Sequence, residues 1–180
     1  MPDNQSQMQE QLFTAKTLYR ELHQQPAQNN DGKLLLFNDL VQLVLGNPKV
    51  DAQQLMQQVN QSLVLRRQYM QLLQKVAFAT SPVQAAASSV AEISSRKTTE
   101  FELLFKRDKQ FSGQVYAILK IPHSIEKHHN QGVRVNCCSD ELISSIHFPP
   151  IVDGKTQLLM EESDQRFINM FDAEFAIYLS

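Results

Sequence analysis

The hydrophobic period of the chain changes near residue 98, and this change limits its possible folds more than any other feature. Before it, apolar residues recur every three or four positions, as they do along one side of an α-helix. After it, apolar and polar residues alternate, as in strands that bury one face. The sequence therefore predicts an α+β protein with helices in its first half and strands in its second.

Three helices are expected before residue 78. The first covers 5–24, where one apolar stripe contains Met8, Leu12, Ala15, Tyr19 and Leu22. The second covers 33–45 and ends at the "GNP" of 46–48, and the third covers 51–76. Because their connections are short, we expect an N-terminal three-helix bundle over residues 1–78.

Six strands are expected over residues 98–180, after a linker at 79–97 that is rich in alanine and serine. Asp153 and Gly154 predict a tight turn, and 163–171 predicts one or two helical turns. Short strands separated by turns favour an antiparallel β-sandwich or open barrel. The expected strands are "TEFELLFK", "GQVYAILKI", "VRVNCC", "LISSIHF", "KTQLLM" and "EFAIYL".

The net charge and the lengths of the apolar runs argue against some classes of function. The formal net charge of −2 gives no electrostatic argument for binding nucleic acid or an anionic membrane directly. The start, "MPDNQSQMQEQ", lacks the basic and apolar regions of a signal peptide, and the apolar run 34–45 is too short to span a bilayer. We expect a cytoplasmic protein.

The only two cysteines are adjacent, in "GVRVNCCSDEL". Neighbouring residues on a strand point to opposite faces, so Cys137 is expected to face inward and Cys138 outward. The pair is therefore interpreted as structural, with a metal, redox or bulged reactive site as the alternative. His123, His128 and His129 lie in an expected loop, where solvent exposure is more usual than metal binding.

Motifs of catalysis are missing from the sequence. It contains no G-x-S-x-G elbow and no glycine-rich phosphate loop, and its five glycines are scattered. We therefore expect a protein that is not an enzyme, with no catalytic residue, metal or cofactor. A thiol- or metal-dependent enzyme remains a third possibility.

The segment "LRRQYMQ" (65–71) supplies the candidate partner-binding residues. Two arginines are too few to follow a nucleic-acid backbone, whereas Arg and Tyr are frequent at the centres of protein interfaces. We therefore expect Arg66, Arg67 and Tyr69 to contact a protein partner. Alternatively, the two arginines only cover the bundle with their aliphatic stems.

Residues 60–180 carry a family resemblance. The segments "SPVQAAAS", "FELLFKRDKQFSGQVYAILKIP", "FPPIVDGKTQLLMEESDQRF" and "FAIYLS" resemble small bacterial regulatory proteins encoded beside extracytoplasmic-function sigma factors, some of them anti-sigma-like. Zinc-type members carry an H-x-x-x-C-x-x-C run on their helices, where this chain has only His23. The resemblance thus implies a zinc-free form whose helical half binds a sigma factor.

These patterns lead to two hypotheses. The first is a non-enzymatic, cytoplasmic regulatory or adaptor protein that binds a protein partner through its helical half, with a sigma factor as the partner that the resemblance implies. The second is a structural or assembly component that acts through self-association.

Overall fold

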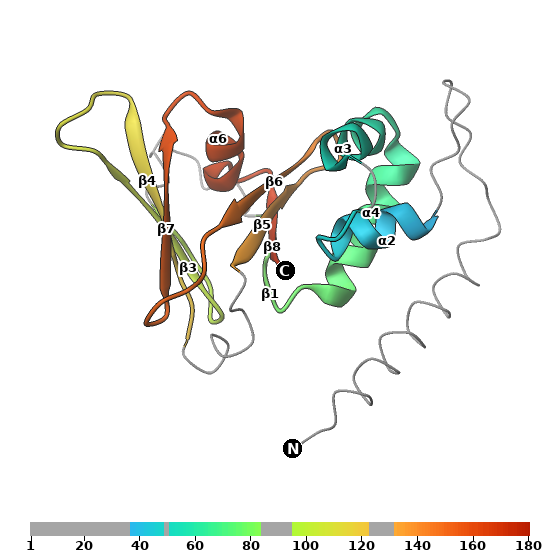
Figure 1. Cartoon of the computed structure of the whole chain (residues 1–180), viewed down its shortest axis with the longest axis horizontal. Helices are drawn as coiled ribbons and strands as arrows, with labels where there is room; N and C mark the ends of the chain where they lie inside the picture. The colour runs from blue at the N-terminus through green and yellow to red at the C-terminus, as the bar shows by residue number, and fades with distance from the viewer. Residues whose placement is uncertain (1–36, 49–50, 84–94, 123–131) are drawn as a thin grey trace, which may run out of the picture.

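A computed structural model of the chain describes residues 37–48, 51–83, 95–122 and 132–180. The described residues form helices and strands in the order shown in Figure 1. The helices are α2 (Phe37–Val44), α3 (Ala52–Gln61), α4 (Leu63–Val76) and α6 (Gln165–Phe171). The strands are β1 (Ala79–Ser81), β2 (Ser95–Lys97), β3 (Glu102–Arg107), β4 (Gln114–Lys120), β5 (Val133–Cys138), β6 (Ile143–Phe148), β7 (Lys155–Glu161) and β8 (Ala176–Leu179).

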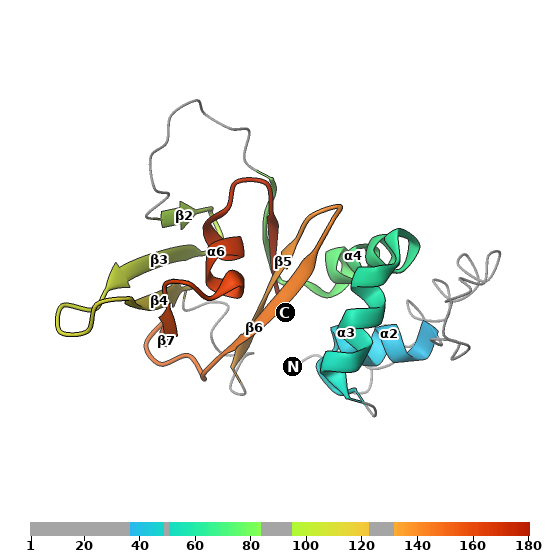
Figure 2. The ribbon, with the colours of Figure 1, turned by 90° about the horizontal axis from the view of Figure 1, so that it is seen from above.

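The strands form two antiparallel sheets. Sheet A has the strand order β1-β8-β5-β6, and sheet B has the order β2-β3-β4-β7. The turn at Asp153 and Gly154 is present, and both residues have the positive φ that a tight hairpin turn requires. Figures 1 and 2 show α2, α3 and α4 on the side of sheet A that faces away from sheet B. The order of layers is therefore helices, sheet A, sheet B.

The main core lies between the two sheets. It follows the two-residue alternation of the strands, because Val133, Val135 and Cys137 of β5 all belong to it. Helix α6 completes this core, with the rings of Phe167 and Phe171 packed edge-on against Phe105 at centroid distances of 5.7 and 5.0 Å. A short helix thus fills space that the strands leave open.

A second core joins the helices to sheet A. Cys138 and Ile143 of the sheet are buried in one cluster with apolar residues of α2, α3 and α4. Asn60 of α3 donates to the carbonyl oxygen of Ile143 and accepts from its N–H, both at 2.8 Å. Arg134 of β5 donates to the carbonyl oxygen of Leu43 in α2 at 2.7 Å. The helices are therefore a layer of the sandwich.

The predicted N-terminal three-helix bundle is wrong. The apolar faces of α2, α3 and α4 pack against sheet A as well as one another, so these helices do not close a core of their own. The helix predicted over 51–76 is divided at Ser62, whose backbone is extended and whose hydroxyl caps α4 by accepting from the N–H of Leu65. The helix predicted over 5–24 lies outside the described residues.

The strand count of the predicted fold is also wrong. The six expected strands are present, but the described residues contain eight strands. The two additional strands, β1 and β2, lie at the ends of the segment 79–97 that was expected to be a linker. β1 pairs with β8, and β2 pairs with β3. The partner of β1 lies far along the chain, whereas β2 pairs with the next strand but consists of polar residues that show no apolar alternation.

Candidate interaction surface

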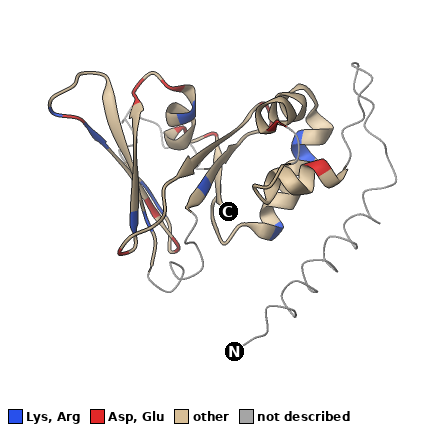
Figure 3. Cartoon of the chain, viewed as in Figure 1, with Lys and Arg blue, Asp and Glu red and all other residues tan. Residues whose placement is uncertain are grey.

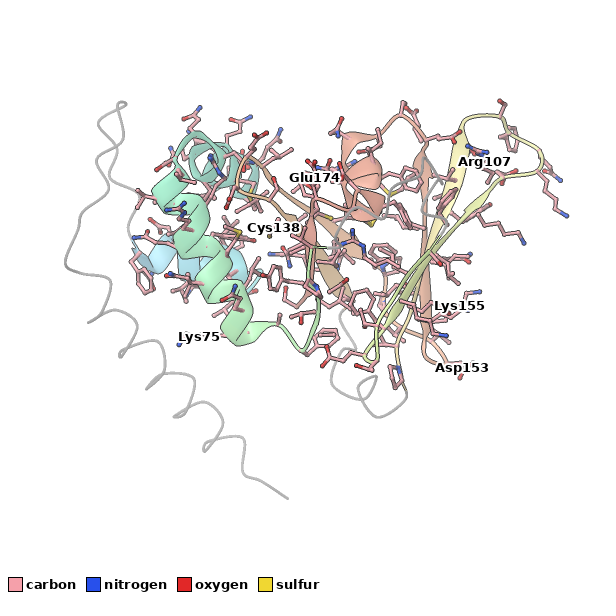
Figure 4. The ribbon with its side chains drawn as sticks, turned by 180° about the vertical axis from the view of Figure 1, so that it is seen from behind. Lys75, Arg107, Cys138, Asp153, Lys155 and Glu174 are labelled. Carbon is pink, nitrogen blue, oxygen red and sulfur yellow. The ribbon has the colours of Figure 1, made fainter. Side chains whose placement is uncertain are left out.

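The two thiols lie in different cores. Cys137 faces sheet B, whereas Cys138 faces the helices, and the exposed fractions are 0% and 1%. Figure 4 shows Cys138 between the helical layer and the sheet. The prediction of opposite faces is confirmed, but the expected exposure of Cys138 is wrong because the helices cover that face.

Burial also makes the thiols chemically inert. It raises the pKa of Cys137 to about 12 and raises the pKa of Cys138 as well. The thiolate is the form that attacks a substrate or binds a metal, and it is disfavoured at both positions near neutral pH. Neither cysteine is therefore suited to nucleophilic or metal chemistry.

A metal centre has no candidate among the described residues, because no three His, Cys, Asp or Glu side chains there could hold an ion together. His147 is exposed on β6, whereas His123, His128 and His129 lie outside the described residues. In the part of the chain that the structure describes, every helix is too short or too polar to cross a membrane.

Arg96 of β2 is a charged residue that is fully buried, and hydrogen bonds account for its burial. It donates from Nη1 to the carbonyl oxygen of Phe175 at 2.6 Å and from Nη2 to that of Asp172 at 2.5 Å. Asp172 is the C-terminal cap of α6, where a cation is favourable. Burial lowers the pKa of Arg96, yet guanidinium remains charged at neutral pH. Arg96 therefore attaches the edge of sheet B to the segment between α6 and β8.

The three predicted partner-binding residues do not share a surface. Tyr69 is buried with an exposed fraction of 0%, and its hydroxyl donates to Oδ1 of the buried Asn136 at 3.4 Å. Arg66 is half-buried and donates from Nε to the carbonyl oxygen of Asp140 at 2.8 Å. Arg67 alone of the three is exposed. The helical spacing from Leu65 to Tyr69 already places Tyr69 on the buried side of α4.

The exposed side of α3 and α4 is poor in charge. We call these exposed residues the helical surface, and glutamine is the commonest residue type among them. Figure 3 shows the helical layer with few charged residues compared with sheet B. The helical surface consists of Ala52, Gln53, Gln54, Gln57, Gln61, Leu63, Val64, Arg67, Gln71, Gln74, Lys75 and Val76.

Apolar side chains are exposed on this surface. Leu63, Val64 and Val76 have exposed fractions of 42%, 48% and 39%, and Leu45, which follows α2, reaches 50%. Exposed apolar residues combined with few charges are typical of the centre of a protein interface. Of the three predicted partner-binding residues, only Arg67 belongs to the helical surface.

Three comparisons with known proteins gave no match: no family model, no curated protein and no solved structure. The resemblance to sigma-factor-associated regulators is untested by them and stays a prediction.

Proposed function

We propose that this chain is a non-enzymatic regulatory or adaptor protein that binds a protein partner through the helical surface. The observation that carries the proposal is the low charge of that surface together with its exposed apolar residues, Leu63, Val64 and Val76. Charged residues are rare at the centres of protein interfaces, because removing a charge from water costs free energy.

The way in which the helices are held supports this role. Asn60, Arg66 and Tyr69 each form a hydrogen bond with sheet A or with the turn after β5. A surface that is fixed before binding loses less conformational entropy when a partner docks. The helical layer thus offers a preorganised platform.

The resemblance described above suggests a sigma factor as the partner, and with it a place in the control of transcription in the cytoplasm. Direct nucleic-acid binding is not part of the proposal, because the helical surface has only two basic residues, Arg67 and Lys75. Arg67 is the residue of this surface best suited to an anchoring contact with the partner.

Purification of the tagged, full-length chain from its own host tests the proposal. We expect a partner protein to co-purify at a stoichiometric ratio, as judged by mass spectrometry and by size-exclusion chromatography with light scattering. The double variant Val64→Asp with Arg67→Glu should reduce recovery of that partner at least about tenfold, because it places charge in the interface centre.

The matched control is Glu174→Lys, which also changes an exposed charge but lies on the turn after α6. It should leave recovery unchanged. Equal recovery with the double variant and the control would contradict the proposal, as would the absence of any stoichiometric partner. A chain that instead associates with itself in a concentration-dependent way would favour the alternative, an assembly component.

A further inference from the structure

The outer face of sheet B carries an apolar centre. Strand alternation turns Leu104, Tyr116, Ile118 and Leu159 to this side, away from the core between the sheets. Leu104 lies opposite Ile118, and Tyr116 lies opposite Leu159, so the four side chains are neighbours on three strands. Leu159 has an exposed fraction of 47%. We call these four residues the apolar patch of sheet B.

The outer face of sheet A is also apolar, and in this fold helices cover it. Its face away from the core carries Cys138, Ile143 and Tyr178, and α2, α3 and α4 cover that face. Among the described residues, no helix covers the corresponding face of sheet B, which lies open in Figures 1 and 2. The same sandwich thus has one apolar outer face that is packed and one that is not.

Lysines surround the apolar patch of sheet B. Lys97, Lys106 and Lys155 point to this side, and none of them forms an ion pair within 4.0 Å with another described residue. Lys120 is already paired with Glu102 at 2.9 Å. Lys97 also lies opposite Glu102 and helps to lower the pKa of that carboxyl. The strand residues on this side thus place four lysines against two carboxylates, Glu102 and Glu161, and this basic surplus favours an external anion.

We propose that the outer face of sheet B binds an acidic, amphipathic helix of a protein partner, with apolar side chains on the patch and carboxylates beside the three lysines. This site is separate from the helical surface and does not rest on the function proposed for it. With both sites, the chain would hold two protein segments on opposite sides of one sandwich; Figure 4 shows Lys75 and Lys155 on those two sides.

Charge favours a partner over the chain's own N-terminal segment. Residues 1–36 contain four acidic side chains (Asp3, Glu10, Glu21 and Asp31) and three basic ones (Lys16, Arg20 and Lys33), so they have almost no net negative charge. Glu102 and Glu161 lie on the same face, so an evenly anionic membrane would meet charges of both signs, whereas a helix can place its carboxylates beside the lysines alone.

Peptide binding to the full chain tests this site. The probe is a synthetic helical peptide of about 18 residues with a leucine stripe flanked by glutamates, long enough for about five turns. Its partner probe has every glutamate replaced by lysine. We expect the acidic peptide alone to bind, measured by fluorescence anisotropy, and its affinity to fall as salt rises from about 0.05 M to about 0.5 M.

Variants of the chain test where the acidic peptide binds. Lys97→Glu combined with Lys155→Glu should weaken binding of the acidic peptide about tenfold, whereas Arg166→Glu on α6, an exposed position outside both proposed surfaces, should have no effect. Methyl NMR of the free chain with a soluble paramagnetic probe should show strong broadening of Leu104, Ile118 and Leu159. Protection of these methyl groups would mean that the chain itself covers the face, and it would overturn the proposal.

Other results would overturn it as well. These are equal binding of the acidic and basic peptides, no binding of the acidic peptide at millimolar concentration, and unchanged affinity in the double lysine variant. Binding to vesicles of anionic lipid that the acidic peptide fails to displace would assign the face to a membrane instead.

Discussion

At the scale of single residues, the covering of Cys138 by the helices decides its chemistry. The strand alternation alone would leave this thiol in solvent, yet its exposed fraction is 1%. We predict that an aromatic disulfide reagent at pH 8 labels both cysteines of the native chain at least about 100-fold more slowly than those of the urea-unfolded chain. Labelling of Cys138 at the unfolded rate would show that the helices do not cover sheet A.

Arg96 gives a second prediction at this scale. Its replacement by methionine keeps an apolar stem in the core but removes the donors to the carbonyl oxygens of Phe175 and Asp172. We expect Arg96→Met to lower the free energy of unfolding by about 2–4 kcal/mol, because the carbonyl oxygen of Phe175 loses this charged donor and that of Asp172 keeps only the N–H of Phe175.

Urea denaturation followed by circular dichroism measures this difference. The control is Lys97→Met, the same substitution at the exposed neighbouring position, which should change the free energy by less than about 0.5 kcal/mol. Equal midpoints for the two variants would mean that Arg96 does not hold the edge of sheet B.

At the scale of elements, α3 depends on one amide side chain for its attachment to the sheet edge. Asn60 both donates to and accepts from the backbone of Ile143. Asn60→Asp replaces the donating amide by an oxygen that repels the carbonyl of Ile143. The expected loss is about 1–3 kcal/mol, measured as the shift in the urea midpoint.

The matched control for this change is Gln57→Glu, which adds one negative charge to the exposed side of the same helix. It should leave the midpoint nearly unchanged. If both variants shift the midpoint equally, the added negative charge causes the loss of stability, and the contact with Ile143 does not contribute to it.

Helices and strands with a local sequence signal could be predicted, whereas those without one could not. Strands β3 to β8 were predictable, because alternation and turn residues such as Asp153 and Gly154 are local signals. The break at Ser62 had a local signal too, since serine is a common N-cap. β1 had none, because its three residues pair with the distant β8. β2 pairs with the nearby β3, but Ser95, Arg96 and Lys97 are all polar and show no apolar alternation.

The candidate site was less predictable than the elements. Periodicity shows that α4 has an apolar side, but it does not show what packs there. The sheet that buries Tyr69 is formed by residues 133–179, far along the chain. The low charge of the helical surface was visible in the sequence as glutamine, yet which glutamines are exposed depends on that packing.

At the scale of the whole molecule, three titratable groups lie on the two sides of sheet A and bind their protons more tightly when folded. Burial raises the pKa of Cys137 from 9.0 to about 12, and it also raises the pKa of Cys138 and Tyr69. The unfolded chain loses the two thiol protons above pH 9 and the tyrosine proton above pH 10, while the folded chain keeps them. Stability is therefore complete below pH 9 and is lost as pH rises toward 12.

We predict that the free energy of unfolding falls by about 3 kcal/mol between pH 8 and pH 10. Urea titrations at the two pH values measure the fall. In the double variant Cys137→Ala with Cys138→Ala the same pH change should cost less than about 1 kcal/mol, whatever its stability at pH 8. An equal fall in both proteins would show that the thiols are not buried in the folded state.

We propose that the helical surface, on a layer fixed to sheet A, binds the partner. Hydrogen–deuterium exchange of the chain alone and in the purified complex tests it most directly. We predict slower exchange in the complex over residues 63–76, and unchanged exchange over 133–138, which is buried in both states. Unchanged exchange over 63–76, with protection found elsewhere, would contradict the account.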